Sequence, residues 1–347
     1  MTTQDPSSST TSAVSAPSRA LQGILCIEIG MLFFVVQDAM MKSLLLSYPI
    51  WMLLFIRSVV SIVVLVPLIL FLGGPHKLRS PFTHIHFMRG ALFATGFSLF
   101  YTAFPFMGLA EVTTIFFSAP LITALMAAFW LKETIGPHRI GALAVGFVGV
   151  VIAVNPTGDG FSLIALLPLA CAVTYSASQI LVRTIGEQES SLTVGLHTLG
   201  WSGVLILPMG WLVNQLVSAT LDYPHLHLTY PEAGLSQWPL LVLLGATGMC
   251  GYIFLSRAYQ VANASLVAPF DYTYLPLATA LGYFVFSEVP GINTLIGMAL
   301  IVSGGLYLGF RELRATRHTD DTPVVAETVF APASPHPTQI PEDENLS

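Results

Sequence analysis

The sequence repeats a short pattern within two of its apolar stretches. Residues 120–133 read PLITALMAAFWLKE and residues 276–288 read PLATALGYFVFSE, so the string Pro-Leu-x-Thr-Ala-Leu occurs in both halves and each copy runs into a glutamate. Glycines follow the two strings at equal distances, at Gly141 and Gly149 and at Gly297 and Gly305. Many secondary transporters consist of two related halves that rock about a binding site between them. The repeat therefore constrains the function of the chain as well as its fold.

The chain carries too few charges to cover a surface that faces water. Of its 347 residues, 9% are charged and 54% are hydrophobic, and the mean hydropathy is +0.74. A soluble domain has about 25% charged residues, so most of this chain is expected to face lipid. Much of the net charge of −6 comes from the segment after Arg317, which contains six acidic residues and no lysine or arginine. No basic patch indicates a nucleic acid partner.

The two ends of the chain differ from its apolar middle. Residues 1–19 are rich in Ser, Thr, Ala and Pro, and residues 318–347 are acidic. Such segments cannot bury a core, so both are expected to be disordered. The first apolar run is long and lacks an obvious cleavage site, which predicts a retained helix and not a signal peptide.

Charged residues and clusters of Pro and Gly divide the middle of the chain into ten apolar runs. Each has roughly the length that a helix needs to cross a bilayer, about 20 residues. The runs lie near residues 20–42, 48–73, 84–104, 106–130 and 138–154 in the first half, and near 161–182, 192–218, 238–260, 264–286 and 292–310 in the second. The predicted fold is an all-α membrane protein with ten transmembrane helices, divided into one repeat over 20–155 and a second over 161–311.

The positions of lysine and arginine set the orientation, because these residues stay on the cytoplasmic side of a membrane. With the N-terminus inside, the inner segments contain eleven of them and the outer connections only Lys42. Both termini are therefore predicted to be cytoplasmic. Five spans per half is an odd number, so the second half must be inverted relative to the first. Glu133 is then expected on the cytoplasmic side and Glu288 on the outer side.

These features together resemble the drug/metabolite transporter superfamily, and more narrowly its EamA-type members. The resemblance is carried in each half by a Pro-containing fourth helix that ends in Glu and by a glycine-bearing fifth helix. It is carried also by residues 268–288, APFDYTYLPLATALGYFVFSE, followed by Val-Pro-Gly. It covers residues 20–311 and implies a multi-pass secondary transporter in the bacterial inner membrane. It leaves the substrate open, because the family spans amino acids, vitamins, nucleotide-like metabolites and drugs.

Charged side chains inside apolar spans are costly and usually face a cavity or a partner. Asp38 lies near the outer end of the first span, and Lys42 follows four residues later on the same helix face, which predicts a structural ion pair. Arg57 lies about ten residues into the second span. We expect it either to pair with Glu28 or Asp38 of the first span or to bind an anionic group of the substrate.

Asp271 is the favoured candidate for a functional carboxylate. It lies between Pro269 and Pro276, so the ninth helix is expected to be interrupted, and carbonyls freed in this way are tolerated where they line a cavity. Tyr272 and Tyr274 follow it and are candidates for the same pocket. A buried carboxylate at this place is expected to carry a proton or to bind a cationic group of the substrate.

Further polar candidates lie on other spans. Tyr101 on the third span is one. Tyr175 and Gln179 on the sixth span share a helix face and are expected to line a cavity. His84 and His86 form a His-x-His pair with no second pair of ligands nearby, so no metal site is predicted.

The leading hypothesis is a secondary active transporter that moves a small, amino-acid-like organic metabolite by alternating access. The alternatives are a carrier of the same fold for a vitamin or nucleoside-like compound such as riboflavin, and a multipass membrane enzyme. The sequence has no Gly-rich Lys motif for ATP, no His-Glu-x-x-His and no Gly-x-Ser-x-Gly, so we expect neither enzymatic activity nor a cofactor. Protons are a candidate coupling partner, and a homodimer is a candidate assembly.

Reporter fusions test the predicted orientation. Paired alkaline phosphatase and fluorescent-protein fusions are expected to place residue 225 outside the cytoplasm and residue 135 inside it, because the Lys/Arg asymmetry puts both termini inside. The phosphatase should therefore be active only in the fusion at residue 225. The reverse pattern at either residue would refute the inverted arrangement of the two halves.

Overall fold

The computed structural model describes residues 16–74, 76–130, 136–156, 162–185, 188–216, 224–228, 236–262 and 264–316. All regular elements in these ranges are helical, as predicted. The predicted N-terminal tail lies mostly outside the described residues, and its last residues belong to the first helix, which begins at Ala16. The predicted C-terminal tail and Glu133 lie outside them altogether.

The helices described in the first half follow the predicted runs closely. They are α1 (Ala16–Leu44), α2 (Ile50–Leu72), α3 (Thr83–Thr102), α4 (Leu109–Phe116), α5 (Ala119–Trp130) and α6 (Pro137–Val154). Proline marks two of the starts: Pro49 is the N-cap of α2, and Pro137 lies in the first turn of α6, where its missing N–H leaves no helical bond unmade. α6 ends at Asn155, whose left-handed conformation is typical of a helix C-terminus.

The second half contains four long helices and several short ones. The long ones are α7 (Leu166–Ile185), α8 (Ser191–Leu216), α9 (Trp238–Val261) and α12 (Ile292–Thr316). The shorter pieces in the described residues are η1 (Leu163–Ala165), η3 (Pro224–Leu226), α10 (Ala264–Val267), η4 (Ala268–Thr273) and α11 (Tyr274–Phe286). α12 continues past the predicted end near residue 310.

The predicted fourth and ninth spans are broken at the same point of the repeated string. In the first half, Phe117 and Ser118 separate α4 from α5, just before Pro120. In the second half, the 3-10 helix η4 separates α10 from α11, just before Pro276. A proline inside a helix cannot donate a backbone hydrogen bond and its ring clashes with the carbonyl four residues earlier. The predicted interruption of the ninth span is confirmed, and the break in the fourth is an addition that the sequence analysis does not foresee.

Eight helices or helix combinations in the described residues are long and apolar enough to cross a membrane. They are α1, α2, α4 with α5, α6, η1 with α7, α8, α9 and α12. Two predicted spans are not among these eight. One is α3, whose first two turns carry His84, His86 and Arg89. The other comprises α10, η4 and α11, no piece of which reaches 18 residues.

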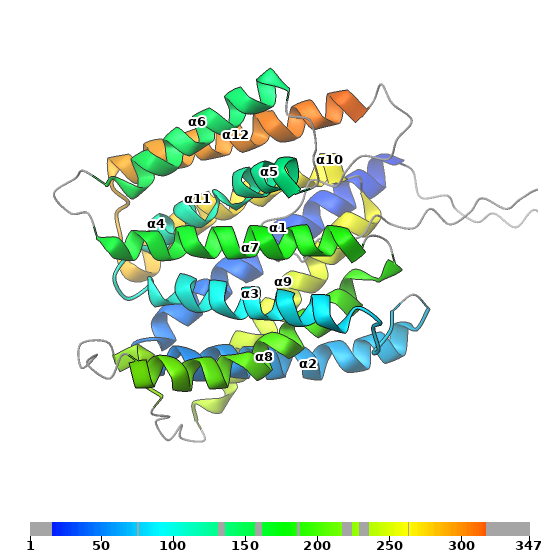
Figure 1. Ribbon diagram of the computed structural model, residues 1–347, viewed down its shortest axis with the longest axis vertical. Coiled ribbons are helices and arrows are strands. Elements are labelled where there is room, and N and C mark those ends of the chain that lie inside the picture. Colours follow the sequence, from blue (N-terminus) through cyan, green and yellow to red (C-terminus); the bar gives the residue numbers. More distant parts are fainter. Residues whose placement is uncertain are drawn as a thin grey trace, which may run out of the picture.

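The two halves interleave and do not form separate bundles (Figure 1). α1 packs along α9, α3 packs along α7, and α2 packs on α8, so each of these contacts joins one half to the other. α6 and α12 lie side by side along one edge of the molecule, at the top of Figure 1. If each helix is replaced by its counterpart in the other half, the same set of pairings results. The packing is therefore close to symmetric between the halves.

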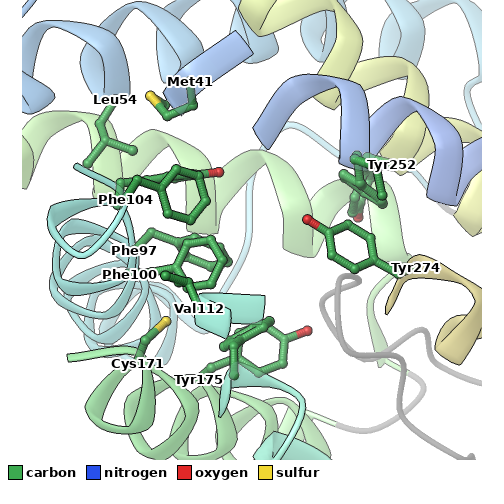
Figure 2. Close-up of a cluster of buried hydrophobic side chains, with 14 of the residues drawn as sticks. Met41, Leu54, Phe97, Phe100, Phe104, Val112, Cys171, Tyr175, Tyr252 and Tyr274 are labelled. Carbon is green, nitrogen blue, oxygen red and sulfur yellow. The ribbon is translucent and has the colours of Figure 1, made fainter. Parts of the chain in front are cut away.

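An aromatic core lies where α3 meets α4 and α7 (Figure 2). Phe97 and Phe100 lie on α3 and Phe104 lies just after its end, and Tyr175 of α7 packs edge-on against Phe97 with ring centroids 6.3 Å apart. All four rings are buried. Each aromatic pair contributes about 0.5–1.5 kcal/mol beyond its area burial, so this core fixes the position of α3.

Close approach of α6 and α12 depends on two of the repeated glycines. A Cβ on Gly297 would lie 2.6 Å from the carbonyl oxygen of Gly149 and 2.7 Å from Cβ of Ala153. A Cβ on Gly149 would lie 2.8 Å from Cβ of Leu300. Small residues at such crossings let membrane helices make dense van der Waals contact where lipid provides no hydrophobic driving force.

The substitution Gly297→Ala tests this contact. Its Cβ would meet a backbone oxygen that cannot rotate away, so α6 and α12 must separate, at a cost of about 1–3 kcal/mol. The matched control is Gly141→Ala, the counterpart of Gly297 in the repeat, because a Cβ there meets nothing within 4 Å. Thermal unfolding in detergent should show a lower midpoint for Gly297→Ala than for the parent protein. Gly141→Ala should not lower the midpoint. Equal midpoints for the two variants would contradict the packing argument.

Candidate functional site

A cavity lies between α1, α2 and α3 of the first half and α8 and α9 of the second. Its unfilled space, counted together with the open solvent at its mouth, is ≈ 670 Å³. The polar side chains on its wall include Gln37, Asp38, Arg57, Tyr101 and Tyr252. Since helices of both halves form the wall, any relative movement of the halves changes the cavity.

Two glycines admit polar side chains to this cavity. A Cβ on Gly248 of α9 would lie 1.7 Å from Oε1 of Gln37, and a Cβ on Gly195 of α8 would lie 2.5 Å from the hydroxyl of Tyr252. Both glycines line the cavity themselves. A larger residue at either position would displace the amide or the phenol from its place on the wall.

Arg57 lies on α2 within a box of aromatic rings. Its guanidinium carbon lies 5.9 Å, 5.3 Å and 5.5 Å from the ring centroids of Phe93, Phe97 and Tyr101. Its Nη1 also donates a hydrogen bond to the hydroxyl of Tyr101, at 3.0 Å. Cation–π contacts with desolvated rings stabilise a buried guanidinium by up to about 2 kcal/mol. The arrangement keeps a positive charge at the cavity wall.

Asp38 of α1 accepts hydrogen bonds from two tyrosines on other helices. Tyr101 of α3 donates to Oδ1 at 2.7 Å, and Tyr274 of α11 donates to Oδ2 at 2.5 Å. Gln37 Nε2 donates to the Tyr101 hydroxyl at 3.1 Å. Together with the Arg57 bond, this satisfies both lone pairs and the proton of that hydroxyl. Tyr101 therefore joins Arg57 to Asp38, and the charged groups reach one another through a phenol.

The predicted ion pair between Asp38 and Lys42 is replaced by a different one. Lys42 pairs with Glu288, and its ammonium donates to the carbonyl of Met107 at 2.6 Å. The other carboxylate oxygen of Glu288 accepts the backbone N–H of Leu109, at the start of α4, at 2.8 Å. Lys42 lies near the end of α1 and reaches the start of α4 and the residues that follow α11. Asp38 instead accepts hydrogen bonds from its two tyrosines.

Neither predicted partner forms a direct ion pair with Arg57 within the described part of the chain. Asp38 is linked to Arg57 through the hydroxyl of Tyr101, and Glu28 has no ion pair among the described residues. Glu28 lies further down α1 and is partly exposed. The structure therefore allows both predicted roles of Arg57. It is linked to the first helix through Tyr101, and it places a cation on the cavity wall.

The Asp271 region forms a second buried polar cluster, separate from the cavity wall. Asp271 lies on η4 and is 2% exposed, and it interacts electrostatically with Tyr259 of α9 and with Tyr272. On α7, Gln179 donates to the hydroxyl of Tyr175 at 2.9 Å, which confirms that these two share a face. Of the residues predicted from the ninth span, only Tyr274 reaches the cavity network, through Asp38.

Sequence reasoning missed Gln37 and the aromatic wall. Gln37 is 4% exposed and stands next to Asp38 in an apolar span, so its amide was a usable signal. Phe93 and Phe97 have no such signal, because phenylalanine is common throughout these spans and only the fold turns these two toward Arg57.

Comparison with known proteins gives one family. The model of the EamA-like transporter family matches residues 21–155 and 162–310. A riboflavin transporter of Vibrio cholerae is 28% identical over 88% of this chain and 98% of its own length, and one of Brucella anthropi is 27% identical over 73% and 86%. An S-adenosylmethionine uptake transporter of Rickettsia bellii is 27% identical over 75% and 84%. A solved crystal structure shares the fold, with a TM-score of 0.54 at 22% identity over 88% of this chain and 100% of its own.

Removal of single hydroxyls tests the network around Asp38. Tyr101→Phe removes the group that bonds Arg57, Gln37 and Asp38 together, whereas Tyr274→Phe removes one bond to Asp38. Hydrogen bonds to charged groups contribute about 1.5–3 kcal/mol each, so the unfolding midpoint should fall more for Tyr101→Phe than for Tyr274→Phe. Differential scanning fluorimetry of the purified variants measures both. A larger loss for Tyr274→Phe would contradict the central position of Tyr101.

Proposed function

Because the chain belongs to the EamA-like transporter family, we propose that it is a secondary active transporter that moves a small organic metabolite by alternating access. The observation that carries the proposal is the cavity, whose wall combines α1, α2 and α3 with α8 and α9. A site between two related halves opens to either side of a membrane when the halves rock. The absence of an ATP-binding motif from the sequence supports transport without nucleotide hydrolysis by this chain.

The proposed topology is ten spans in two inverted five-helix repeats, with both termini in the cytoplasm of a bacterium and the chain in its inner membrane. The spans are the eight apolar ones together with α3 and the α10–η4–α11 segment. The exchange symmetry of the helix pairings and the matching breaks before Pro120 and Pro276 support two equivalent repeats. A homodimer is the proposed assembly, and the dimer interface is not assigned.

The proposed substrate is a planar nitrogen heterocycle of the riboflavin or nucleoside-like class. Flat rings stack on aromatic side chains, and Phe93 and Phe97 provide such faces beside Arg57. The amide of Gln37 and the hydroxyl of Tyr252 supply the few polar groups that orient a ligand in a mostly apolar pocket. The similar proteins favour this class, because they are named as transporters of riboflavin and of S-adenosylmethionine.

An amino-acid-like substrate, the leading expectation from the sequence, is the second candidate. Arg57 would bind its carboxylate, as arginine commonly does. Its ammonium group would need a carboxylate, and both oxygens of Asp38 already accept hydrogen bonds from tyrosines. Each oxygen keeps room for a further donor, so it is the aromatic wall beside Arg57 that favours the heterocycle over the amino acid.

Asp271 is the proposed coupling residue, as a proton carrier or as an anchor for a cationic group of the substrate. It is a buried carboxylate beside a break in a span, a setting that is typical of functional acids in transporters. Its polar neighbours are Tyr272 and Tyr259, which interact electrostatically with it. Tyr259 in turn interacts with Tyr175, which accepts a hydrogen bond from Gln179.

Flux through proteoliposomes tests the function. Purified protein is expected to take up radiolabelled riboflavin saturably, and unlabelled riboflavin inside should accelerate uptake, because a carrier returns faster when loaded. Arg57→Leu and Phe97→Ala should each weaken riboflavin binding at least tenfold, which flavin fluorescence quenching measures. Arg79→Leu, whose side chain is exposed between α2 and α3, is the control and should bind normally. Linear flux without countertransport, or conversion of riboflavin to a product, would refute the proposal.

Asp271→Asn separates the two roles of that residue in the same vesicles. A proton carrier predicts loss of pH-driven uptake with exchange retained, whereas an anchor predicts loss of binding itself. Normal uptake, exchange and binding in a folded Asp271→Asn preparation would remove Asp271 from the mechanism and leave the cavity proposal standing.

A further inference from the structure

A further cluster of buried ionisable groups, distinct from the Asp271 region, lies where α3 and α8 begin, away from the residues assigned to the substrate. His86 of α3 is 0% exposed, Arg89 on the same helix is 1% exposed, and Glu189, just before α8, is 7% exposed. His197 of α8 stacks on His86, with ring centroids 4.8 Å apart and an interplanar angle of 19°. The His-x-His motif thus has one member in a fully buried site.

The hydrogen bonds of His86 define which of its atoms can take a proton. Its Nε2 lies 2.8 Å from Oε2 of Glu189 and 2.9 Å from the hydroxyl of Ser80. A carboxylate only accepts hydrogen bonds, so Nε2 carries a hydrogen. Nδ1 is buried and has no hydrogen-bond partner within the described part of the chain. In the neutral ring Nδ1 is therefore an open lone pair, and a proton that binds there makes an imidazolium–carboxylate pair.

The groups that face His86 limit the site to one proton. Arg89 of α3 and Glu189 contribute one charge of each sign, and His197 of α8 lies against the ring. On the side of the cavity, Tyr252 of α9 interacts electrostatically with Arg89. Two charged imidazoles in stacked contact would repel strongly in a medium of low dielectric constant. One of the two rings is therefore protonated at a time, and only His86 has a carboxylate within hydrogen-bond distance.

The same cluster ties the two halves together. His86 and Ser80 belong to the first family-matched segment, whereas Glu189 and α8 belong to the second. Next to them, Nδ1 of His76 lies 2.8 Å from the hydroxyl of Ser190. Tyr252, which lines the cavity, donates to the carbonyl of Ser191, at the first residue of α8. Separation of the halves at this end must break the His86–Glu189 bond.

We propose that His86 and Glu189 form a proton-binding site that holds α3 to the start of α8 while the proton is bound, and that loss of the proton frees this end of the cavity to open. Protonation puts a positive charge on the imidazole beside the Glu189 carboxylate, and opposite charges attract strongly in a medium of low dielectric constant, so the imidazolium–carboxylate pair resists separation more than the imidazole–carboxylate pair. Histidine gains and loses a proton more readily near neutral pH than the other side chains, so a proton on His86 is suited to act as a switch. The inference rests on the proposed alternating access of the two halves.

Distance measurements between spin labels test the site without any substrate. The full chain, with Cys26, Cys171 and Cys250 replaced by alanine, would carry labels at Arg79→Cys and Gln188→Cys, two exposed positions on either side of the contact. In lipid nanodiscs, double electron–electron resonance should give one short distance at low pH and a growing longer one as the pH rises and the histidine loses its proton. His86→Gln should abolish this response, and Glu189→Gln should move its midpoint down by about one pH unit or more.

The control uses the exposed member of the His-x-His motif. His84→Gln should keep the response of the parent protein. A parent protein whose distances do not change with pH would overturn the proposal, as would an unchanged response in folded His86→Gln. If His86→Gln does not fold, an unchanged midpoint in the near-isosteric Glu189→Gln overturns it. Failure of riboflavin flux would leave these distances unaffected, so the site and the transport function fail separately.

Discussion

The cavity of this protein depends on the hydroxyl of Tyr101. An unpaired charge inside a membrane is costly, and the second span carries Arg57 while the first carries Asp38. Tyr101 stands between them: it accepts from Arg57 and donates to Asp38. This geometry satisfies both charges and leaves the guanidinium at the cavity wall, where a direct ion pair would have drawn it onto α1. The single hydroxyl of Tyr101 thus keeps the positive charge of Arg57 at the wall of a polar cavity.

The secondary structure and the class of protein could be predicted because they follow from local patterns. Apolar runs of the length of a bilayer give the spans, and Pro269 and Pro276 give the interrupted ninth span, since proline cannot continue a helix ladder. The break before Pro120 was equally available from the repeat. It was missed because no charged residue lies beside Pro120 to draw attention to the break. α3 also shows that a helix can carry Arg89 and His86 and still pack in the core.

The side-chain partners could not be predicted, because they join residues far apart in the sequence. Spacing of four residues suggested that Lys42 pairs with Asp38, but spacing says nothing about Glu288 and Tyr274, which reach the same region from the other half. The interleaved packing places α1 against α9 and α11, so each polar residue of α1 chooses among partners that a one-dimensional pattern does not contain. Gln37 illustrates the same limit, since its place on the wall requires a glycine at position 248.

The two ends of the molecule are closed by pairs of different chemistry. At the end where α1 stops, Lys42 pairs with Glu288, which also binds the start of α4. At the end where α3 and α8 start, His86 pairs with Glu189. Lys42 brings an ammonium against a carboxylate, whereas His86 brings an imidazole, a group that can gain or lose a proton, against Glu189. The two contacts between the halves therefore differ in chemistry, and the proposed proton site of His86 and Glu189 lies at one of them. Under that proposal, a change of pH acts at the end where α3 and α8 start and so favours opening at that end.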